Sequence, residues 1–475
     1  MTAYADLDLT ELTTAIRTGQ LSPSEALEGH LARIDAVNPS INAVVTRVDE
    51  AARERAAAAD AQFVAARAEG RDLPPLFGVP LTHKDSIPTA GIRTTFGSPL
   101  FKDNVPTASA VLIDRLQAAG VNSTGKTNVP EFAAGSHTFN PLFGTTRNPY
   151  DPTTSAGGSS GGAAAAIAAG IQPVGDGSDT GGSLRTPGSF CNLIGYRPSH
   201  GRIPVVSALN PWTWMSRQGF LARTVADIRL LMRAVAGPHP AVPGSLPVDG
   251  SYNEPAVSAL ENLTGVRVGW STDLGLGLPV ESRVLDVIAA HPQTFADLGA
   301  VVEEAVPDLS DAEEVFQATR AFDFATAYAD LIDAHRLEIK DAMVCNVDKG
   351  TALTFTDFKS ANAARARLEA SQRVFFATHD VLITPAVQVA PFDADLEFPT
   401  EVAGVLTPNY LDWMRAATTI SATGLPCLSV PAGFTPEGLP VGLQLVTAAG
   451  NDALLLRIAE VFARATGYAQ KRPVI

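Results

Sequence analysis

Two patterns near the start of the chain predict helices. Ser22-Pro23-Ser24-Glu25 combines a serine N-cap, a proline at the first helical position and a glutamate that closes a capping box. Leu27, Leu31 and Ile34 then fall on one face of the helix that follows. Alanine dominates from Ala51 to Ala68, so we expect a second helix that buries only a thin apolar stripe.

Apolar runs farther along the chain predict strands, some of them linked by helices. Leu76 to Asp85 indicates a short strand that delivers a lysine to a loop. Val266 to Trp270, a helix from about Glu281 to Leu298, and Ala300 to Glu304 form a strand-helix-strand unit. Such units favour a sheet with parallel strands. Strands are also expected at Asp380 to Thr384, Cys427 to Pro431 and Val441 to Val446, and a final helix at about Asp452 to Thr466.

Glycine, serine and alanine dominate the segment from Gly157 to Gly188. It nevertheless predicts a small-residue helix from Gly161 to Ala169 and a short strand near Pro173 to Asp176. Glycine at this density is usually a geometric requirement of the backbone. Gly237 to Pro255, which is rich in proline and glycine, is instead the best candidate for a long surface connection.

The composition of the 475 residues, 45% hydrophobic and 18% charged, indicates an ordinary globular chain rather than a disordered one. The formal charge is 35 − 50 = −15, which disfavours nucleic acid and anionic membranes as partners. The first residues lack the basic and apolar regions of a secretory signal, and no stretch holds about 18 uninterrupted apolar residues. We therefore expect a cytoplasmic protein.

The cysteines and histidines predict neither disulfides nor a metal site. Cys191, Cys345 and Cys427 are scattered and odd in number, which is typical of buried thiols in a reducing compartment. The eight histidines include no His-x-x-x-His pair, and no two cysteines stand at metal-ligand spacing. We expect no metal.

One motif match has to be rejected. The segment from Gly120 to Thr127 has the sequence GVNSTGKT and matches the P-loop consensus at every defined position. A P-loop lies between a strand and the helix that it opens. Here Thr107 is expected to cap a helix that Gly120 ends, and Val121 to Lys126 reads as a strand that enters a loop. The backbone N–H groups of a helix start, which would hold phosphate, are therefore absent.

Two glycine-flanked serines carry the chemistry, and they stand 183 − 159 = 24 residues apart: Ser159 in GGSSGG and Ser183 in DTGGSLR. A serine hydroxyl is a weak nucleophile unless a base takes its proton and donors hold the oxyanion that forms. Lys84, on a separate loop, offers a base without histidine. The glycines before Ser183 favour backbone N–H groups turned toward one point, which makes four residues candidates for an oxyanion hole: Thr180, Gly181, Gly182 and Ser183 itself.

At these motifs the sequence resembles the amidase signature family, and the resemblance covers nearly the whole chain. The segment from Gly157 to Gly188 follows that family's long glycine- and serine-rich pattern without a break. Supporting motifs stand in the expected order: Gly78 to Asp85 (GVPLTHKD), Thr94 to Ser98 (TTFGS), Gly125 to Asn128 (GKTN), Gly424-Leu-Pro, Ser429-Val-Pro431 and Gly438 to Gln444 (GLPVGLQ).

The resemblance implies a role for each residue of this constellation. Ser183 would be the nucleophile, Ser159 a bridging serine on a cis peptide bond, and Lys84 the base. A base must be neutral, so Lys84 must be buried deeply enough to lower its pKa. Asp179 and Arg185 would brace the nucleophile loop. No cofactor is implied.

Further residues are expected around this triad. Ser160 would support Ser159 from behind, and the roles of His83 and Asp85, beside the lysine, stay open. Large aromatic residues are more often part of the core than of a binding site. Three of them are nevertheless candidates for a substrate pocket: Trp212, Trp214 and Trp413.

The expected fold class is α/β, a large single domain over 1–475 with a central mixed, mostly parallel twisted sheet covered by helices on both faces. Within it we expect N-terminal helices over about 5–70, a catalytic core over about 71–236, a more variable substrate-loop region over about 237–400, and closing strands and a helix over about 401–475.

The family implies a serine hydrolase that cleaves a carbon–nitrogen amide bond through an acyl-enzyme. His137 to Asn140 (HTFN), after Gly135-Ser136, resembles broad-range amidases that include some urethanases. We therefore expect a small-molecule substrate, namely an aryl or aliphatic amide, an ester or a carbamate, and a chain that works as a monomer or homodimer. The alternative is the glutamine-hydrolysing subunit of a tRNA-dependent amidotransferase. A silent scaffold protein is disfavoured because Lys84, Ser159 and Ser183 are all intact.

Overall fold

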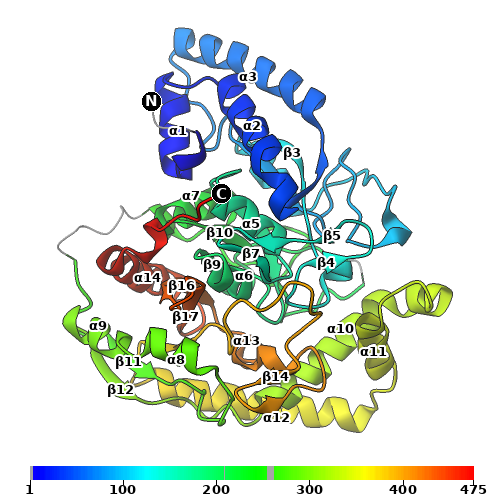
Figure 1. Ribbon diagram of the computed structural model, residues 1–475, viewed down its shortest axis with the longest axis vertical. Coiled ribbons are helices and arrows are strands. Elements are labelled where there is room, and N and C mark those ends of the chain that lie inside the picture. Colours follow the sequence, from blue (N-terminus) through cyan, green and yellow to red (C-terminus); the bar gives the residue numbers. More distant parts are fainter. Residues whose placement is uncertain (1–3, 208, 254–260) are drawn as a thin grey trace.

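The computed structural model describes residues 4–207, 209–253 and 261–475, and Figure 1 shows their arrangement. The helices α1 to α3 lie at one end of the molecule and α10 to α12 at the other, with the strands of a large sheet between them.

The α-helices are α1 (Leu9–Thr18), α2 (Pro23–Ile41), α3 (Asp49–Glu69), α4 (Val111–Ala118), α5 (Gly161–Ala168), α6 (Arg185–Phe190), α7 (Val225–Val235), α8 (Ser282–Ile288), α9 (His291–Asp297), α10 (Ala312–His335), α11 (Asp341–Thr351), α12 (Phe355–Phe376), α13 (Arg415–Thr423) and α14 (Asp452–Thr466). The strands are β1 (Val44–Arg47), β2 (Pro80–Lys84), β3 (Asn122–Thr127), β4 (Phe139–Asn140), β5 (Gly144–Thr145), β6 (Arg147–Asn148), β7 (Asp151–Ser155), β8 (Val174–Asp179), β9 (Ile194–Arg197), β10 (Arg217–Ala222), β11 (Arg267–Trp270), β12 (Val301–Glu304), β13 (Val381–Pro385), β14 (Glu401–Val402), β15 (Val405–Leu406), β16 (Cys427–Phe434) and β17 (Pro440–Val446).

The central sheet has the strand order β12-β11-β13-β17-β16-β9-β10-β8. The strands β11, β12 and β13 run parallel, as the strand-helix-strand unit predicts. The expectation of a mostly parallel sheet is wrong, because the other neighbouring pairs of this sheet are antiparallel. The pair β16 and β17 is antiparallel because only residues 435–439 join the two strands, and this connection is too short for a parallel crossover. A smaller sheet, β1-β3-β2, holds Lys84 at the end of β2.

Helices cover both faces of the central sheet, as the fold class requires. Successive side chains of a strand point to opposite faces. On β13, Val381 and Ile383 join a core cluster with residues of α7 and α14, whereas Leu382 joins another with residues of α10, α12 and α13. On β10, Leu221 points toward α2 and α5. The α/β class and the mixed, helix-covered sheet are confirmed.

Local signals in the sequence predicted some element ends and missed others. The capping box of α2 is confirmed, since Glu25 N donates to Ser22 Oγ at 3.1 Å and Ser22 N donates to Glu25 Oε2 at 2.8 Å. Thr107 is not a cap, because α4 begins at Val111 after Ala110. The helix expected from Glu281 to Leu298 is two helices, α8 and α9. Pro292 stands in the first turn of α9, the helical position that suits proline.

The region of the predicted long connection, Gly237 to Pro255, holds one short 3-10 helix, Gly250–Asn253, and is mostly exposed; Pro255 lies outside the described residues. None of the helices in the described ranges is long and apolar enough to cross a membrane.

Candidate active site

Lys84 ends strand β2 in the fully buried interior. Its backbone N–H donates to Asp176 Oδ1 at 2.8 Å, which ties the strand end to β8. Its Nζ lies 2.8 Å from Ser159 Oγ, 2.9 Å from Ser160 Oγ and 2.9 Å from Ser178 Oγ. Three hydroxyl groups thus surround one amine.

The environment of Lys84 favours the neutral amine. Burial lowers the pKa of Lys84 to about 7, although the carboxylates of Asp179 and Asp176 act in the opposite direction. An ammonium group can only donate hydrogen bonds, whereas a neutral amine also accepts a proton. Lys84 can therefore take a proton from a neighbouring hydroxyl near neutral pH.

Ser159 stands just before α5, and the peptide bond between Gly158 and Ser159 is cis, as the resemblance implied. The glycines around it are a packing requirement. A Cβ on Gly161 would lie 2.4 Å from Thr138 Oγ1, and one on Gly162 would lie 2.3 Å from Asn128 N. The glycines of the GGSSGG motif thus allow the loop of Ser159 to pack closely against another segment of the chain.

Ser183 lies in the loop between β8 and α6, beside the Ser159 loop. Ser160 N donates to the carbonyl oxygen of Ser183 at 3.2 Å, which joins the two loops. Ser183 is 7% exposed and Ser159 1%, so Ser183 is the more accessible of the two. Gly182 has φ +112°, and a Cβ there would lie 2.6 Å from Ala417 Cβ, so the position before Ser183 requires glycine.

Asp179 and Arg185 brace this loop, as the sequence predicted. Arg185 Nη2 donates to Asp179 Oδ1 at 2.8 Å and Arg185 Nε to Asp179 Oδ2 at 3.0 Å, and both side chains are fully buried. Despite its burial, Asp179 has a pKa well below the usual range because of Arg185 and Arg197. The loop is therefore held by a charged pair that stays ionised.

One oxyanion candidate needs correction. The N–H of Gly182 donates to Asp179 Oδ1 at 2.9 Å, so it is not available to an oxyanion. The amides of Thr180, Gly181 and Ser183 remain as candidates. The sequence could not show this, because Asp179 accepts hydrogen bonds from its own loop only when the loop is folded.

A cavity of about 460 Å³ opens beside these loops. Ser178, which contacts Lys84, and Thr180, which precedes Ser183 in the loop, lie on its wall. Much of the rest is apolar and aromatic, with rings from distant parts of the chain: Phe96, Phe132, Phe324 and Tyr328. Sequence reasoning did not assign these rings or Ser178 to the site. Phe96 lies in the TTFGS motif and Ser178 in the segment 157–188, but a motif does not show which of its side chains face a cavity.

The three tryptophans do not line this cavity. Trp413 is 1% exposed and packs against Phe190 and Phe392 in the core, so its assignment to a substrate pocket is wrong. Trp212 is 87% exposed, and Trp214 lines neighbouring cavities instead. The tryptophans were predicted as pocket residues because they are large and aromatic, but a large aromatic side chain suits a core position equally well.

The residues around Lys84 have structural roles. His83 Nδ1 lies 2.5 Å from Asp176 Oδ2, and its Nε2 lies 2.8 Å from Ser123 Oγ, so His83 fixes the carboxylate that holds Lys84. Asp85 accepts a hydrogen bond from Thr95 N at 3.1 Å.

The P-loop motif is confirmed as a false match: Asn122–Thr127 is strand β3, and Lys126 Nζ donates to Ile87 O at 2.6 Å.

No group of three or more histidine, cysteine or acidic side chains in the part of the chain that the structure describes is placed to hold a metal ion.

Comparisons with known proteins agree over almost the full length. The family model described as Amidase matches residues 25–456. The chain is 38% identical over 473 residues to "Acylamidase" of Rhodococcus erythropolis, covering 98% of this chain and 97% of that protein. It is 32% identical over 499 residues to a glutamyl-tRNA(Gln) amidotransferase subunit from Geobacillus kaustophilus, covering 99% of each. The crystal structure of a bacterial aryl acylamidase of the amidase signature family matches with a TM-score of 0.90 and 27% identity, over 98% of this chain and 97% of that one.

Proposed function

Because this chain belongs to the amidase signature family and is a hydrolase acting on amides, we propose that it cleaves small aryl amides through an acyl-enzyme on Ser183. The observation that carries the proposal is the position of Lys84 Nζ within 2.9 Å of the Ser159, Ser160 and Ser178 hydroxyls, with a pKa lowered to about 7. A lysine of this kind replaces the histidine of other serine hydrolases as base.

The proposed cycle moves two protons in each half-reaction. Neutral Lys84 takes the proton of Ser159 while Ser159 takes that of Ser183, and Ser183 Oγ adds to the substrate carbonyl. The amides of Thr180, Gly181 and Ser183 stabilise the resulting oxyanion. The relay then returns a proton to the nitrogen as the carbon–nitrogen bond breaks. Water hydrolyses the acyl-enzyme by the same route.

The lining of the 460 Å³ cavity supports an aryl substrate. Phe96, Phe132, Phe324 and Tyr328 line it, and an aromatic lining suits a flat apolar group. The resemblance to "Acylamidase" and to a bacterial aryl acylamidase points to the same class. Carbamates and esters present a similar carbonyl, so we include them in the proposal.

Glutamine, the alternative substrate, carries two charges, and protein groups already engage the two charged side chains of the cavity. The charged side chains on the cavity wall are Arg320 and Asp323. Arg320 Nη2 donates to Tyr410 Oη at 2.6 Å and Arg320 stacks on Phe324, while Asp323 accepts from Asn210 Nδ2 at 2.7 Å. A zwitterion would therefore have to compete with these contacts for both side chains while it loses hydration.

A substrate panel tests this preference. The purified chain alone should hydrolyse an aryl amide such as a nitroanilide, and more weakly a carbamate, with kcat/KM at least about a hundredfold above that for glutamine, because desolvating the two charges of glutamine is costly. Release of nitroaniline and of ammonia measures the two activities. Turnover confined to glutamine, or appearing only with partner subunits, would contradict the proposal.

The proposed base predicts a pH profile. Lys84 acts when neutral, so kcat/KM should fall about tenfold per pH unit below a limb near pH 7. Asp176 raises the pKa of Lys84, so Asp176→Asn should move this limb to lower pH. Asp333→Asn, an exposed acid on α10, serves as the control and should leave it in place. A limb that does not move in Asp176→Asn would argue against Lys84 as its origin.

A further inference from the structure

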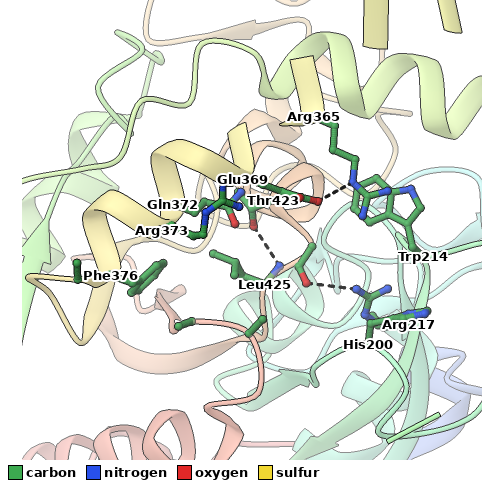
Figure 2. A pocket seen from close by; sticks show the side chains of 14 residues that line it. His200, Trp214, Arg217, Arg365, Glu369, Gln372, Arg373, Phe376, Thr423 and Leu425 are labelled. Carbon is green, nitrogen blue, oxygen red and sulfur yellow. Dashed lines mark hydrogen bonds and ion pairs between the residues drawn. The ribbon is translucent and has the colours of Figure 1, made fainter. Parts of the chain in front are cut away.

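A second cavity, of about 510 Å³, lies outside the proposed catalytic site (Figure 2). Its walls come from helix α12, the start of β10, the residues that follow α13, and Ala448 and Ala449. Figure 2 shows Arg365 and Glu369 on one side, and Arg217 and His200 on another. The volume is in the range of small-molecule sites.

The wall of this cavity is positively charged although the chain carries a net charge of −15. Arg217, Arg365 and Arg373 face a single acid, Glu369, which pairs with Arg365 at 3.1 Å. Arg373 has no carboxylate within ion-pair distance among the described residues. Two positive charges therefore remain without a counterion in the wall.

Arg217 is the more unusual of these, because it is a buried cation with poor partners. Its residue is 4% exposed. Its Nη1 and Nη2 reach the carbonyl oxygens of Ser216 and Gly424 only at 3.4 and 3.3 Å, and its Nε has no hydrogen-bond partner in the described ranges. Gln372 Nε2, on the facing helix, is likewise without an acceptor there. Two buried donors thus lack an acceptor beside one cavity, which is costly for a folded protein.

The carboxylate of the core that acts on Arg217 does not neutralise its positive charge either. Asp179, a buried carboxylate whose charge acts on Arg217, is bound by Arg185 at 2.8 Å and lies 3.8 Å from Arg197. Partial burial and the charges of Arg217, Arg197 and Arg365 lower the pKa of His200 to about 4, so His200 is neutral near pH 7. The region has a positive potential that an anion would relieve.

Much of the rest of the cavity is apolar and includes aromatic rings. The Arg365 guanidinium lies 3.8 Å over the ring of Trp214, and Phe376 and Leu425 also line the cavity, with Phe376 on the side away from Trp214 (Figure 2). Glu369 in the wall disfavours a ligand with several negative charges. These features fit one carboxylate attached to an apolar, ring-containing body.

This cavity and the proposed catalytic one share a wall. Thr213 and Ser216 line the catalytic cavity, whereas Trp214 and Arg217 line the second one. Ser216 Oγ accepts a hydrogen bond from Thr180 Oγ1 at 3.1 Å. A ligand at Arg217 would therefore lie beside the loop of Ser183 without entering the catalytic cavity.

We propose that the second cavity is a binding site for an organic monocarboxylate with an aromatic or similarly flat apolar body. This inference is independent of the amide substrate proposed above, because it rests on charges and contacts outside the catalytic cavity.

Calorimetric titration of the full chain with sodium benzoate tests the site. Benzoate should bind, and benzyl alcohol, which has the ring without the charge, should bind at least about tenfold more weakly, since a charge-assisted contact is lost. Arg365→Gln and Arg373→Gln should each weaken benzoate binding several-fold. Arg367→Gln is the matched control: it removes one charge from the same helix at an arginine that pairs with Asp311 outside the cavity, and it should bind benzoate like the wild type.

Arg365→Gln also removes a stacking contact with Trp214, so the exposed Arg373 provides a second variant that leaves this packing intact. Benzoate binding that is absent in the wild type, or unchanged in both cavity variants, would overturn the proposal. So would equal affinity for benzyl alcohol. None of these results depends on turnover, so the amidase proposal would stand.

Discussion

Replacing Ser183 with alanine should lower kcat for an aryl amide by about 10⁶-fold, to the background of the assay, because no covalent intermediate can form without the attacking oxygen. The side chain is small and 7% exposed, so its truncation leaves little empty space. The variant should therefore fold normally. Release of nitroaniline from a nitroanilide measures the effect, and thermal unfolding verifies the fold.

Ser86→Ala provides the matched control for this experiment. Ser86 lies on the wall of the catalytic cavity and has no place in the relay. It should retain activity within a few-fold of the wild type. Substantial turnover in Ser183→Ala, or an equal loss in Ser86→Ala, would refute the assignment of Ser183 as the nucleophile.

Lys84→Met should reduce kcat by about 10²–10⁴-fold, the usual contribution of a general base, and more if the relay acts as a unit. Methionine fills most of the buried space and removes the amine that contacts Ser159, Ser160 and Ser178. Combining it with Ser183→Ala should cost little beyond Ser183→Ala alone, because residues of one relay are not additive.

Lys126→Met separates catalysis from stability. Lys126 is the other buried lysine of the small sheet, its pKa is lowered to about 8 by burial, and it donates to Ile87 O and Thr89 Oγ1 instead of to a serine. Its replacement should lower the unfolding temperature while kcat of the folded enzyme stays nearly unchanged. A comparable loss of kcat in both lysine variants would indicate that the loss in Lys84→Met comes from replacing a buried lysine and not from removing a general base.

The sequence predicted those parts of the fold that local chemistry determines. The capping box of Ser22 and Glu25 set the start of α2, and the small residues of Gly161–Ala168 set α5. Strand pairing was not predictable in this way, because it depends on contacts between distant segments. Strands β9 and β10 carry Gly195 and Gly219, which are poor strand formers; a Cβ on Gly195 would lie 2.1 Å from Leu184 O.

The residues of the candidate site likewise fall into those that the sequence could identify and those that it could not. Lys84, Ser159, Ser160, Asp179 and Arg185 belong to recognisable motifs, and the structure brings their loops together. The ring of Tyr328 lies in no motif, and the segment 157–188 contains Ser178 without singling it out, since only the fold brings α10 to the end of β8. Trp413 shows the opposite error: its size suggested a pocket, and its position is in the core.

The attack of Ser183 on the substrate carbonyl is best tested by labelling the chain with a serine-reactive fluorophosphonate, followed by peptide mass spectrometry. We expect one adduct, on the peptide that contains Ser183, with no labelling in Ser183→Ala and slower labelling in Lys84→Met. An adduct on Ser159, Ser160 or Ser178 in the wild type, or undiminished labelling of Ser183→Ala, would contradict the role of Ser183 as the nucleophile.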